Sequence, residues 1–396
     1  AFPFSIRARL SADNGKTWTG VAPLNNDAFG DGKFDDAPAL ATDKAGMWLA
    51  VWDADGGTTL PAIGFDGDLL IARSEDNGAT WTDPVPFNTN AETDGPYDYD
   101  TSVDLATDEN GNWIAVWFSR HNFGGVGNDY DILTARSSDN GVTWSDPARL
   151  NNNAFGDSGD DRFPRIATDT QGNWVTVWES NDWLGGEKAP FDWDIMVSHS
   201  SENGALWSDP KRLNSDGAAD IVHDERPSIA TDRLGNWVTA WVSKKKTWSD
   251  TDIYVSRSAD NGAHWTVKVP LHASAATDKE DDQFPYIATD RQGTWAVAWV
   301  TGASLEGMNL CDLLYSVSAS EGALWTAPVP LNSNAATDTG LDYDVTLAVD
   351  DERNWIAAWR SDDSLGGNNL GHDDDILTTR GRSGITVKWP NKEVTW

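Results

Sequence analysis

The chain repeats an aspartate at two fixed places, and these carboxylates are its most regular candidates for chemistry. The aspartate at the first position lies eight residues before another aspartate, which ends a recurring apolar segment. The aspartate at the second position begins a later apolar segment of the same copy. Both places hold aspartate in all six copies. The first column consists of Asp35, Asp100, Asp161, Asp224, Asp282 and Asp342. The second column consists of Asp68, Asp131, Asp194, Asp252, Asp312 and Asp375.

Three interpretations of these aspartate columns stay open. Each carboxylate could cap a loop by accepting backbone N–H bonds, and the caps would then repeat with the loop geometry. Carboxylates that lie close together repel each other, and a hard cation with oxygen ligands, such as Ca²⁺, would relieve that repulsion. A pair of carboxylates could also act as the acid and base of a glycoside hydrolase. The columns are therefore the candidate metal ligands, with Ca²⁺ as the candidate cofactor.

Four short strands are predicted around these aspartates in each copy. One copy begins with Phe163 to Asp169 and, after a turn, continues with Trp174 and Trp178. A spacing of four in a strand puts both indoles on one face. A third strand, clearest at Asp131 to Arg136, and a short edge segment in which proline is tolerated complete the copy. Each copy therefore predicts a four-stranded antiparallel blade.

Six such copies of roughly 60 residues predict an all-β fold, a six-bladed β-propeller that forms a single domain over residues 1–383. A segment like the third strand occurs once more at the start, at Ile6 to Leu10. We therefore expect the N-terminal hairpin to supply the outer part of the last blade, so that pairing of the N- and C-terminal segments closes the ring. Residues 384–396 would add an edge strand or form a tail.

A polar turn follows the third strand of each copy, with the pattern Ser-x-Asp-x-Gly-x-Thr-Trp, clearest at Ser137 to Trp144. Its glycine suits a positive φ, its aspartate and serine can bond turn amides, and its tryptophan can bury a large face. The turn resembles the Asp box, or BNR repeat, of sialidase-like propellers, and the resemblance covers nearly the whole chain. Asp boxes also occur in sorting receptors and assembly factors that hydrolyse nothing, so the resemblance implies a fold more than an activity.

A sialidase would also have three arginines that hold the substrate carboxylate, a tyrosine activated by a glutamate, and an aspartic acid. The arginine motif Phe-Arg-Ile-Pro has its nearest match at residues 163–166, in permuted order. The resemblance thus implies candidates for catalysis and for ligand binding, although salt bridges on an acidic surface, or loop packing for the tryptophan, would explain the same residues. The catalytic candidates are Arg165, Arg226, Tyr343 and Asp161. The ligand-binding candidates are Trp183, Arg120 and Arg360.

The composition disfavours several partners. There are 29 Lys and Arg residues against 63 Asp and Glu, and the resulting net charge of −34 repels nucleic acid and anionic lipid. No apolar run approaches the roughly 20 residues that span a bilayer. The single Cys311 has no partner for an intrachain disulfide. No nucleotide fingerprint or zinc-like histidine spacing appears, so neither an organic cofactor nor a transition-metal site is expected.

We therefore expect a secreted or cell-surface protein that is monomeric and binds a glycan or glycoconjugate or serves as a scaffold, stabilised by calcium. The chain opens on Ala1-Phe2-Pro3 without an initiator methionine, which suggests processing or a trimmed fragment. The alternative is an active glycoside hydrolase of the exo-sialidase type. Enzymes usually break repeat symmetry at the active site, and the aspartate columns do not break, which favours binding over catalysis.

Overall fold

Contacts divide this computed structural model into two compact units, Ala1–Lys188 with Met196–Lys211, and Ala189–Ile195 with Arg212–Trp396. No helix in the described part of the chain is long and apolar enough to cross a membrane. The single-domain assignment over residues 1–383 stays a prediction. The described residues are 5–24, 35–55, 67–89, 91, 98–120, 129–152, 159–182, 192–214, 222–244, 250–276, 280–302, 312–332, 340–362, 375–383 and 387–388.

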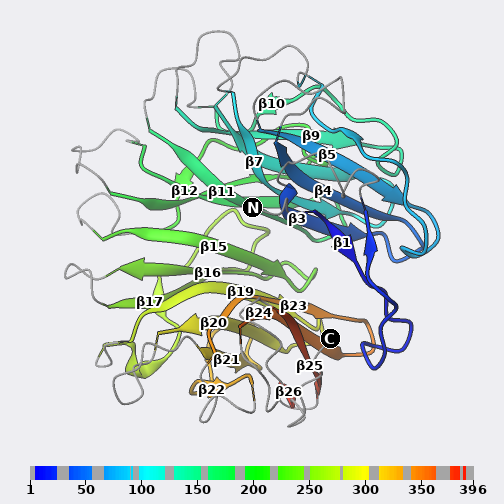
Figure 1. Cartoon of the computed structure of the whole chain (residues 1–396). Coiled ribbons are helices and arrows are strands. Elements are labelled where there is room, and N and C mark those ends of the chain that lie inside the picture. The colour runs from blue at the N-terminus through cyan, green and yellow to red at the C-terminus, as the bar shows by residue number, and fades with distance from the viewer. Residues whose placement is uncertain are drawn as a thin grey trace. The chain divides into compact units, whose positions relative to one another are not determined.

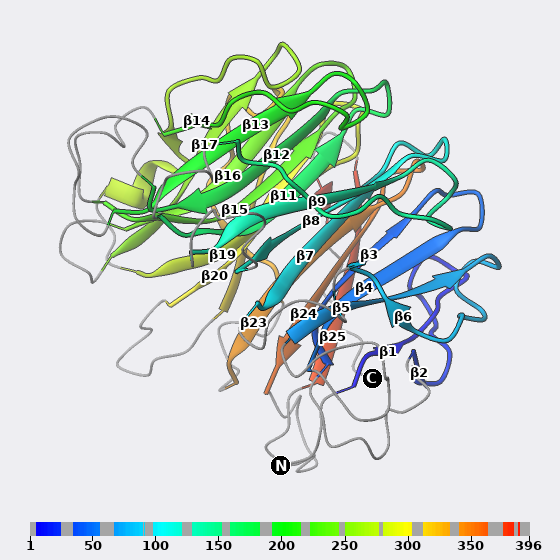
Figure 2. The ribbon, with the colours of Figure 1, turned by 90° about the horizontal axis from the view of Figure 1, so that it is seen from above.

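The structure confirms a six-bladed β-propeller of four-stranded antiparallel blades (Figure 1). Within each blade the strands pair in sequence order, from the innermost first strand to a short fourth strand of two residues. The four strands of the first blade lie side by side in Figure 2. The first three blades are formed by β3 (Asp35–Thr42), β4 (Trp48–Asp55), β5 (Gly67–Ser74) and β6 (Val85–Pro86); by β7 (Asp100–Thr107), β8 (Trp113–Ser119), β9 (Asp131–Ser137) and β10 (Ala148–Arg149); and by β11 (Asp161–Thr168), β12 (Trp174–Ser180), β13 (Asp194–Ser200) and β14 (Lys211–Arg212).

The fourth to sixth blades repeat this pattern, and a short 3₁₀ helix at Ala273–Ala276 is the helical element among the described residues. These blades are formed by β15 (Asp224–Thr231), β16 (Trp237–Lys244), β17 (Thr251–Ser258) and β18 (Val269–Pro270); by β19 (Asp282–Thr289), β20 (Trp295–Thr301), β21 (Asp312–Ser318) and β22 (Val329–Pro330); and by β23 (Asp342–Val349), β24 (Asn354–Ser361), β25 (Asp375–Ser383) and β26 (Val387–Lys388).

The tryptophan pairs of the second strands form the core between blades. Trp113 and Trp117 are fully buried and belong to one apolar cluster with Leu49, Val51 and Leu69 of the preceding blade. Their spacing of four places both indoles on the same face of β8, as predicted. In the same way the second blade covers the tryptophans of the third, the fourth blade those of the fifth, and the fifth blade those of the sixth.

The polar turn after the third strand closes against the preceding blade. In the second blade Asn140 and Gly141 have φ of 60° and 71°, and a Cβ on Gly141 would lie 2.5 Å from Leu49 Cδ1. The Ser137 hydroxyl accepts the Gly141 N–H at 2.9 Å. Asp139 accepts both the backbone N–H and the hydroxyl of Thr143, which lowers the pKa of Asp139 to about 2. The predicted roles of the glycine and the aspartate are confirmed.

The N-terminal hairpin does not take the place predicted for it. Its strands β1 (Arg7–Ala8) and β2 (Ala22–Pro23) form a sheet of their own, and Ile6 joins an apolar cluster with Trp52 of the first blade. The outer strand of the last blade is β26 (Val387–Lys388), which pairs with β25. β26 follows β25 within a few residues, and such a local pairing costs little loop-closure entropy.

Every innermost strand carries a bulge at its third residue. The residues at this position have φ between 47° and 56°, and the pairing with the second strand shifts register there, as between Arg162 and Arg165. Bulges re-aim side chains and are frequent next to active sites. The six bulged residues are Ala37, Ser102, Phe163, Arg226, Phe284 and Asp344.

Candidate functional site

The two aspartate columns meet where consecutive blades join, and an asparagine connects them. Asn151 donates its side-chain N–H groups to Asp131 at 3.0 Å and to Asp161 at 2.6 Å. Trp178 Nε1 donates to the same Asp161 at 2.9 Å. All four side chains are buried. The asparagine thus cross-links the third strand of one blade to the first strand of the next.

The same arrangement recurs at other blade junctions. Asn88 donates to Asp68 at 2.9 Å and to Asp100 at 2.7 Å, and Asn214 donates to Asp194 at 2.6 Å and to Asp224 at 2.7 Å. Asn332 donates to Asp342 at 2.8 Å. Burial raises the pKa of Asp312, and a hydrogen bond from Asn332 opposes that rise.

These aspartates accept hydrogen bonds, as the predicted loop caps would. The donors described above are asparagine and tryptophan side chains, whereas the predicted donors were backbone N–H groups. Burial raises the pKa of Asp131 to about 6, and the hydrogen bond from Asn151 opposes that rise. Asp35 accepts the Trp52 indole N–H at 3.2 Å. Asp375, in the last blade, is only partly buried. The assignment of the twelve aspartates as calcium ligands stays a prediction.

The junction asparagines also have a signal in the sequence, which alignment on the aspartates alone misses. Each follows a leucine or phenylalanine directly after the short fourth strand. One junction departs from this pattern and has a histidine there. The pairs are Phe87-Asn88, Leu150-Asn151, Leu213-Asn214, Leu271-His272 and Leu331-Asn332.

The sialidase-derived candidates of the first unit lie in separate surroundings. Asp161 belongs to the buried junction with Asn151. Arg165 is exposed on β11. Desolvation raises the pKa of the partly buried Asp104 on β7, and the charge of Arg165 opposes that rise. Arg120 lies with its guanidinium carbon 5.6 Å from the centre of the Tyr130 ring. Trp183 lies outside the described residues.

In the second unit the candidates occupy the fourth and sixth blades. The Arg226 guanidinium lies 5.3 Å from the centre of the Phe284 ring. Arg360 lies 5.0 Å from the centre of the Tyr343 ring, and its Nη1 is 3.6 Å from a carboxylate oxygen of Asp344. The structure therefore brings Arg360 and Tyr343 together as a cation–π pair.

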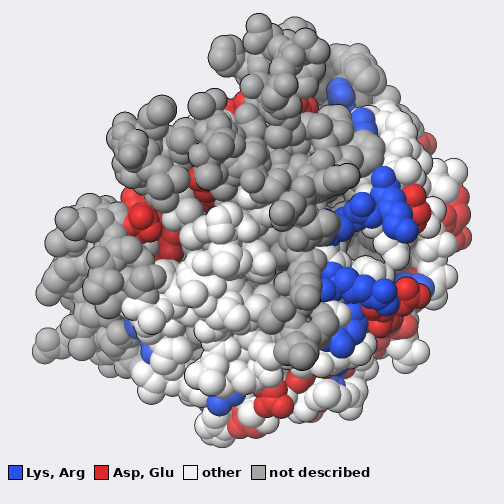
Figure 3. All heavy atoms as spheres, turned by 90° about the horizontal axis from the view of Figure 1, so that it is seen from below, with Lys and Arg blue, Asp and Glu red and all other residues white. Residues whose placement is uncertain are grey.

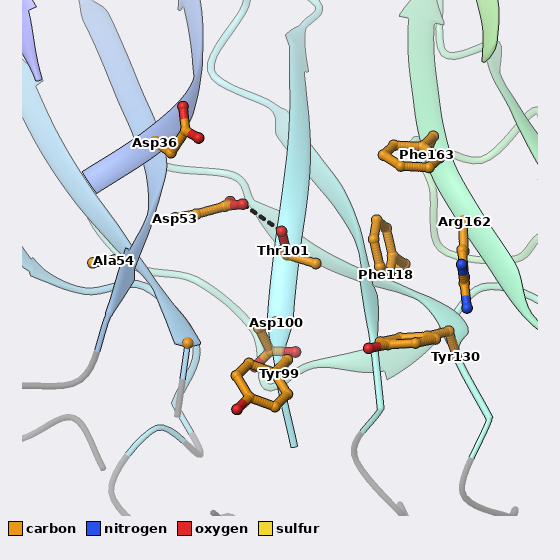
Figure 4. Close-up of a pocket in the computed structure, with 11 residues that line it drawn as sticks. Asp36, Asp53, Ala54, Tyr99, Asp100, Thr101, Phe118, Tyr130, Arg162 and Phe163 are labelled. Carbon is orange, nitrogen blue, oxygen red and sulfur yellow. Dashed lines mark hydrogen bonds between the residues drawn. The ribbon is translucent and has the colours of Figure 1, made fainter. Parts of the chain in front are cut away.

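A pocket of about 430 Å³ in the first unit is formed by residues of the first three blades. One wall is aromatic: the Phe118 ring lies 5.2 Å from Tyr130 and 5.3 Å from Phe163, both edge-on. The Arg162 guanidinium stacks 4.8 Å from the Tyr130 ring centre (Figure 4). The pocket is lined by Asp36, Asp53, Ala54, Gly67, Tyr99, Asp100, Thr101, Phe118, Tyr130, Arg162 and Phe163.

The opposite side of the pocket is acidic. Asp53 accepts hydrogen bonds from the Thr101 hydroxyl and from the Ser102 backbone N–H, the latter at 3.0 Å. Burial raises the pKa of Asp53 to about 6 against these hydrogen bonds, and the charge of Asp36, directly opposite on β3, raises it further. Asp53 is therefore a carboxyl group that can both give and take a proton near neutral pH.

Asp53 breaks the repeat, and so do the residues around it. Its place in the second strand is held in the other blades by Phe118, Glu179, Val242, Val300 and Arg360. The residues on each side of the first aspartate column also differ between copies, such as Tyr99 and Thr101 in one blade and Asp160 and Arg162 in the next. The aspartate columns predicted as sites are constant, whereas the pocket is built largely from their variable neighbours.

The pocket carries more negative than positive charge. Asp36, Asp53 and Asp100 line it, and Arg162 is the basic residue among its described lining. That guanidinium is held by Asp160, with Nη2 2.5 Å from a carboxylate oxygen. On the face drawn in Figure 3, Lys and Arg atoms likewise lie beside Asp and Glu atoms.

Solved structures with a similar fold include glycan-acting enzymes. A protein of unknown function from Dyadobacter fermentans aligns with a TM-score of 0.55 at 14% identity, over 89% of this chain and 95% of that chain. An α-L-arabinanase from Penicillium chrysogenum, complexed with arabinobiose, aligns with a TM-score of 0.53 at 17% identity, over 88% and 93%. A mutant NanB sialidase from Streptococcus pneumoniae aligns with a TM-score of 0.51 at 12% identity, over 92% and 68%.

The two enzymes among these three neighbours are an arabinanase and a sialidase. At such identities the likeness establishes the fold alone. The sequence matches no protein-family model and no curated protein.

Proposed function

We propose that this chain binds a neutral oligosaccharide in the pocket of the first three blades. The observation that carries the proposal is the combination of an aromatic wall, made by Phe118, Tyr130 and Phe163, with the carboxylates Asp36 and Asp53 opposite it. Sugar rings place C–H groups on aromatic faces, and carboxylates accept hydrogen bonds from sugar hydroxyls. A volume of about 430 Å³ suits one or two sugar units.

The charge of the pocket favours a neutral sugar over a sialic acid. Three carboxylates would repel the carboxylate of a sialoside, and Arg162 already pairs with Asp160. A sialidase site also needs a group of arginines, whereas the described lining offers one. The exo-sialidase alternative therefore receives less support than binding of a neutral glycan.

A second function, hydrolysis of the bound glycan, is favoured by Asp53 alone. A general acid works best with a pKa near the working pH, and burial raises the pKa of Asp53 to about 6. Asp36 lies directly opposite on β3 and supplies the second carboxylate that glycoside hydrolysis needs. Because the similar arabinanase was solved with arabinobiose, arabino-oligosaccharides are the first substrates to test.

The binding proposal is tested by calorimetric titration of the full chain with arabino-, xylo- and gluco-oligosaccharides and with sialyllactose. We expect one of the neutral series to bind and sialyllactose to bind more weakly or not at all. Tightest binding of sialyllactose, or no binding of any neutral series, would contradict the proposal.

Hydrolysis is tested separately on the oligosaccharide that binds. Asp53→Asn keeps an oxygen that can accept the Ser102 N–H but cannot transfer the proton. If Asp53 is the acid, turnover should fall by about 100-fold or more, which exceeds the loss of affinity from one weakened hydrogen bond to the sugar. Turnover that survives the substitution would exclude Asp53 as the acid, and absence of turnover in the parent chain would leave binding as the function.

A further inference from the structure

One blade junction differs from the others in the residue that joins its two aspartates. Between the fourth and fifth blades, His272 stands where the other junctions described above have asparagine. It lies between Asp252, at the start of β17, and Asp282, which opens β19. All three side chains are buried, with exposures of 7% for His272, 0% for Asp252 and 4% for Asp282.

The three side chains converge on one point. One ligand atom from each, a carboxylate oxygen or an imidazole nitrogen, lies within 4.8 Å of the other two. His272 Nε2 is 3.1 Å from a carboxylate oxygen of Asp282. The imidazole is held in place by stacking on Trp299, with ring centres 5.9 Å apart and an interplanar angle of 6°.

Asp282 also lacks a contact that four of the other five aspartates of the first column have. Asp100, Asp161 and Asp342 accept the indole N–H of the second tryptophan of their own blade, as in Trp117 to Asp100 at 2.9 Å. The indole N–H of Trp299 donates to no described residue, so Asp282 is oriented by His272 instead. The indole N–H of Trp241 likewise has no acceptor among the described residues, so the histidine is the departure that is specific to this junction.

We propose that Asp252, His272 and Asp282 form a buried site for a divalent transition metal, of which Zn²⁺ is the best fit. The asparagine NH₂ group that faces the two carboxylates has no lone pair available for a metal ion. A neutral imidazole has such a lone pair, so this junction offers one nitrogen and two oxygen atoms as metal ligands. Such a mixed set suits Zn²⁺ and its neighbours in the first row, and a divalent ion offsets the charge of two carboxylates.

The proposed ion replaces the cross-link that asparagine provides at the other junctions. It ties β17 of the fourth blade to β19 of the fifth, so its binding should stabilise the native chain. This role is separate from the sugar pocket, which lies in the first unit. Calcium is the weaker candidate here, because it prefers oxygen ligands throughout.

The test uses the full chain after treatment with a chelator. We expect one Zn²⁺ per chain by equilibrium dialysis, and a thermal midpoint that rises by about 5 °C at a hundredfold excess over the dissociation constant. Co²⁺ loading should give visible absorption bands from a site with nitrogen and oxygen ligands. His272→Asn restores the residue that this chain uses at its other junctions, so it should fold normally and lose Zn²⁺ affinity by at least about 100-fold.

A gain-of-site variant completes the test. Asn332→His places an imidazole between Asp312 and Asp342, and it should raise the stoichiometry from one Zn²⁺ to two. Undiminished Zn²⁺ binding by H272N, or the lack of any Zn²⁺-dependent rise in the parent chain, would overturn the proposal. Zn²⁺ bound weakly and equally by the parent chain and H272N would mean surface binding only, and would overturn it too.

Discussion

Residues that are neighbours in the sequence have two different roles in this chain. Some join consecutive blades, and others line the pocket of the first three blades. At the junction of the first and second blades, Asn88 joins Asp68 to Asp100, and the same chemistry recurs at other junctions. One residue away from Asp100 on either side, Tyr99 and Thr101 line the pocket and have different counterparts in other blades. Residues that repeat therefore hold the fold, and the residues beside them that vary are available for a ligand.

The largest expected effect comes from opening a junction. Asn151→Ala removes the donor shared by the buried Asp131 and Asp161, and leaving buried carboxylates without that donor should cost about 3 kcal/mol of unfolding free energy. Denaturant unfolding measures this cost. Asn110→Ala, at an exposed turn position, should change it by less than about 0.5 kcal/mol. Equal effects of the two substitutions would refute the structural role of the asparagines.

A second pair of variants isolates the bond from tryptophan to aspartate. Trp117→Phe and Trp299→Phe remove the same volume from fully buried sites, but only Trp117 donates its indole N–H to an aspartate, at 2.9 Å. We expect Trp117→Phe to cost about 2 kcal/mol more, because hydrogen bonds to charged acceptors contribute about that much. If the two thermal midpoints fall equally, this hydrogen bond adds nothing to stability.

The pH dependence of stability tests the environment of Asp53. Its folded-state pKa of about 6 lies above the ordinary aspartate value of 3.8, so the folded protein holds the proton more tightly than the unfolded chain. Asp53 should therefore stabilise the fold at low pH, and this stability should be lost as pH rises from about 4 through 6. A rise in pKa of this size corresponds to about 3 kcal/mol, and partial exposure should reduce the effect to roughly half.

Asp53→Asn removes this titration, so the stability of the variant relative to the parent chain should increase between pH 4 and 7. Asp139, whose pKa is lowered to about 2 by its turn hydrogen bonds, has no such effect in that window, and Asp139→Asn serves as the control. A stability difference between D53N and the parent chain that does not change with pH would show that the pKa of Asp53 is unshifted.

The fold could be predicted from sequence because it repeats. Trp174 and Trp178, at a spacing of four, and the turn from Ser137 to Trp144 recur along the chain, and each copy reinforces the assignment of strands and turns. The place of the N-terminal hairpin was mispredicted because Ile6 to Leu10 resembles a third strand, and the repeat pattern does not reveal that β1 and β2 pair with each other. The fourth strand of the last blade is β26, whose pairing with β25 depends on proximity along the chain.

The candidate site was harder to predict for a physical reason. The constant aspartates, such as Asp161, face buried amide and indole donors, and regularity alone could not distinguish that role from metal binding or catalysis. The pocket residues Asp53, Tyr130 and Phe163 come from three blades and gather through the bulges and packing of the innermost strands. A search for residues that vary between the six copies, next to residues that are the same in all copies, would have found them. The same search would have identified His272.

The central claim, that variable positions of the first three blades bind a sugar, is tested most directly by two equivalent phenylalanines. Phe163 and Phe284 occupy the same bulge position in their blades, with φ of 49° and 53°, but only Phe163 lines the pocket. On calorimetric titration with the neutral oligosaccharide that binds the parent chain, Phe163→Ala should weaken affinity by about tenfold, as expected for one lost aromatic contact, and Phe284→Ala should leave it unchanged. Equal affinities of the two variants would contradict the assignment of the pocket as the binding site.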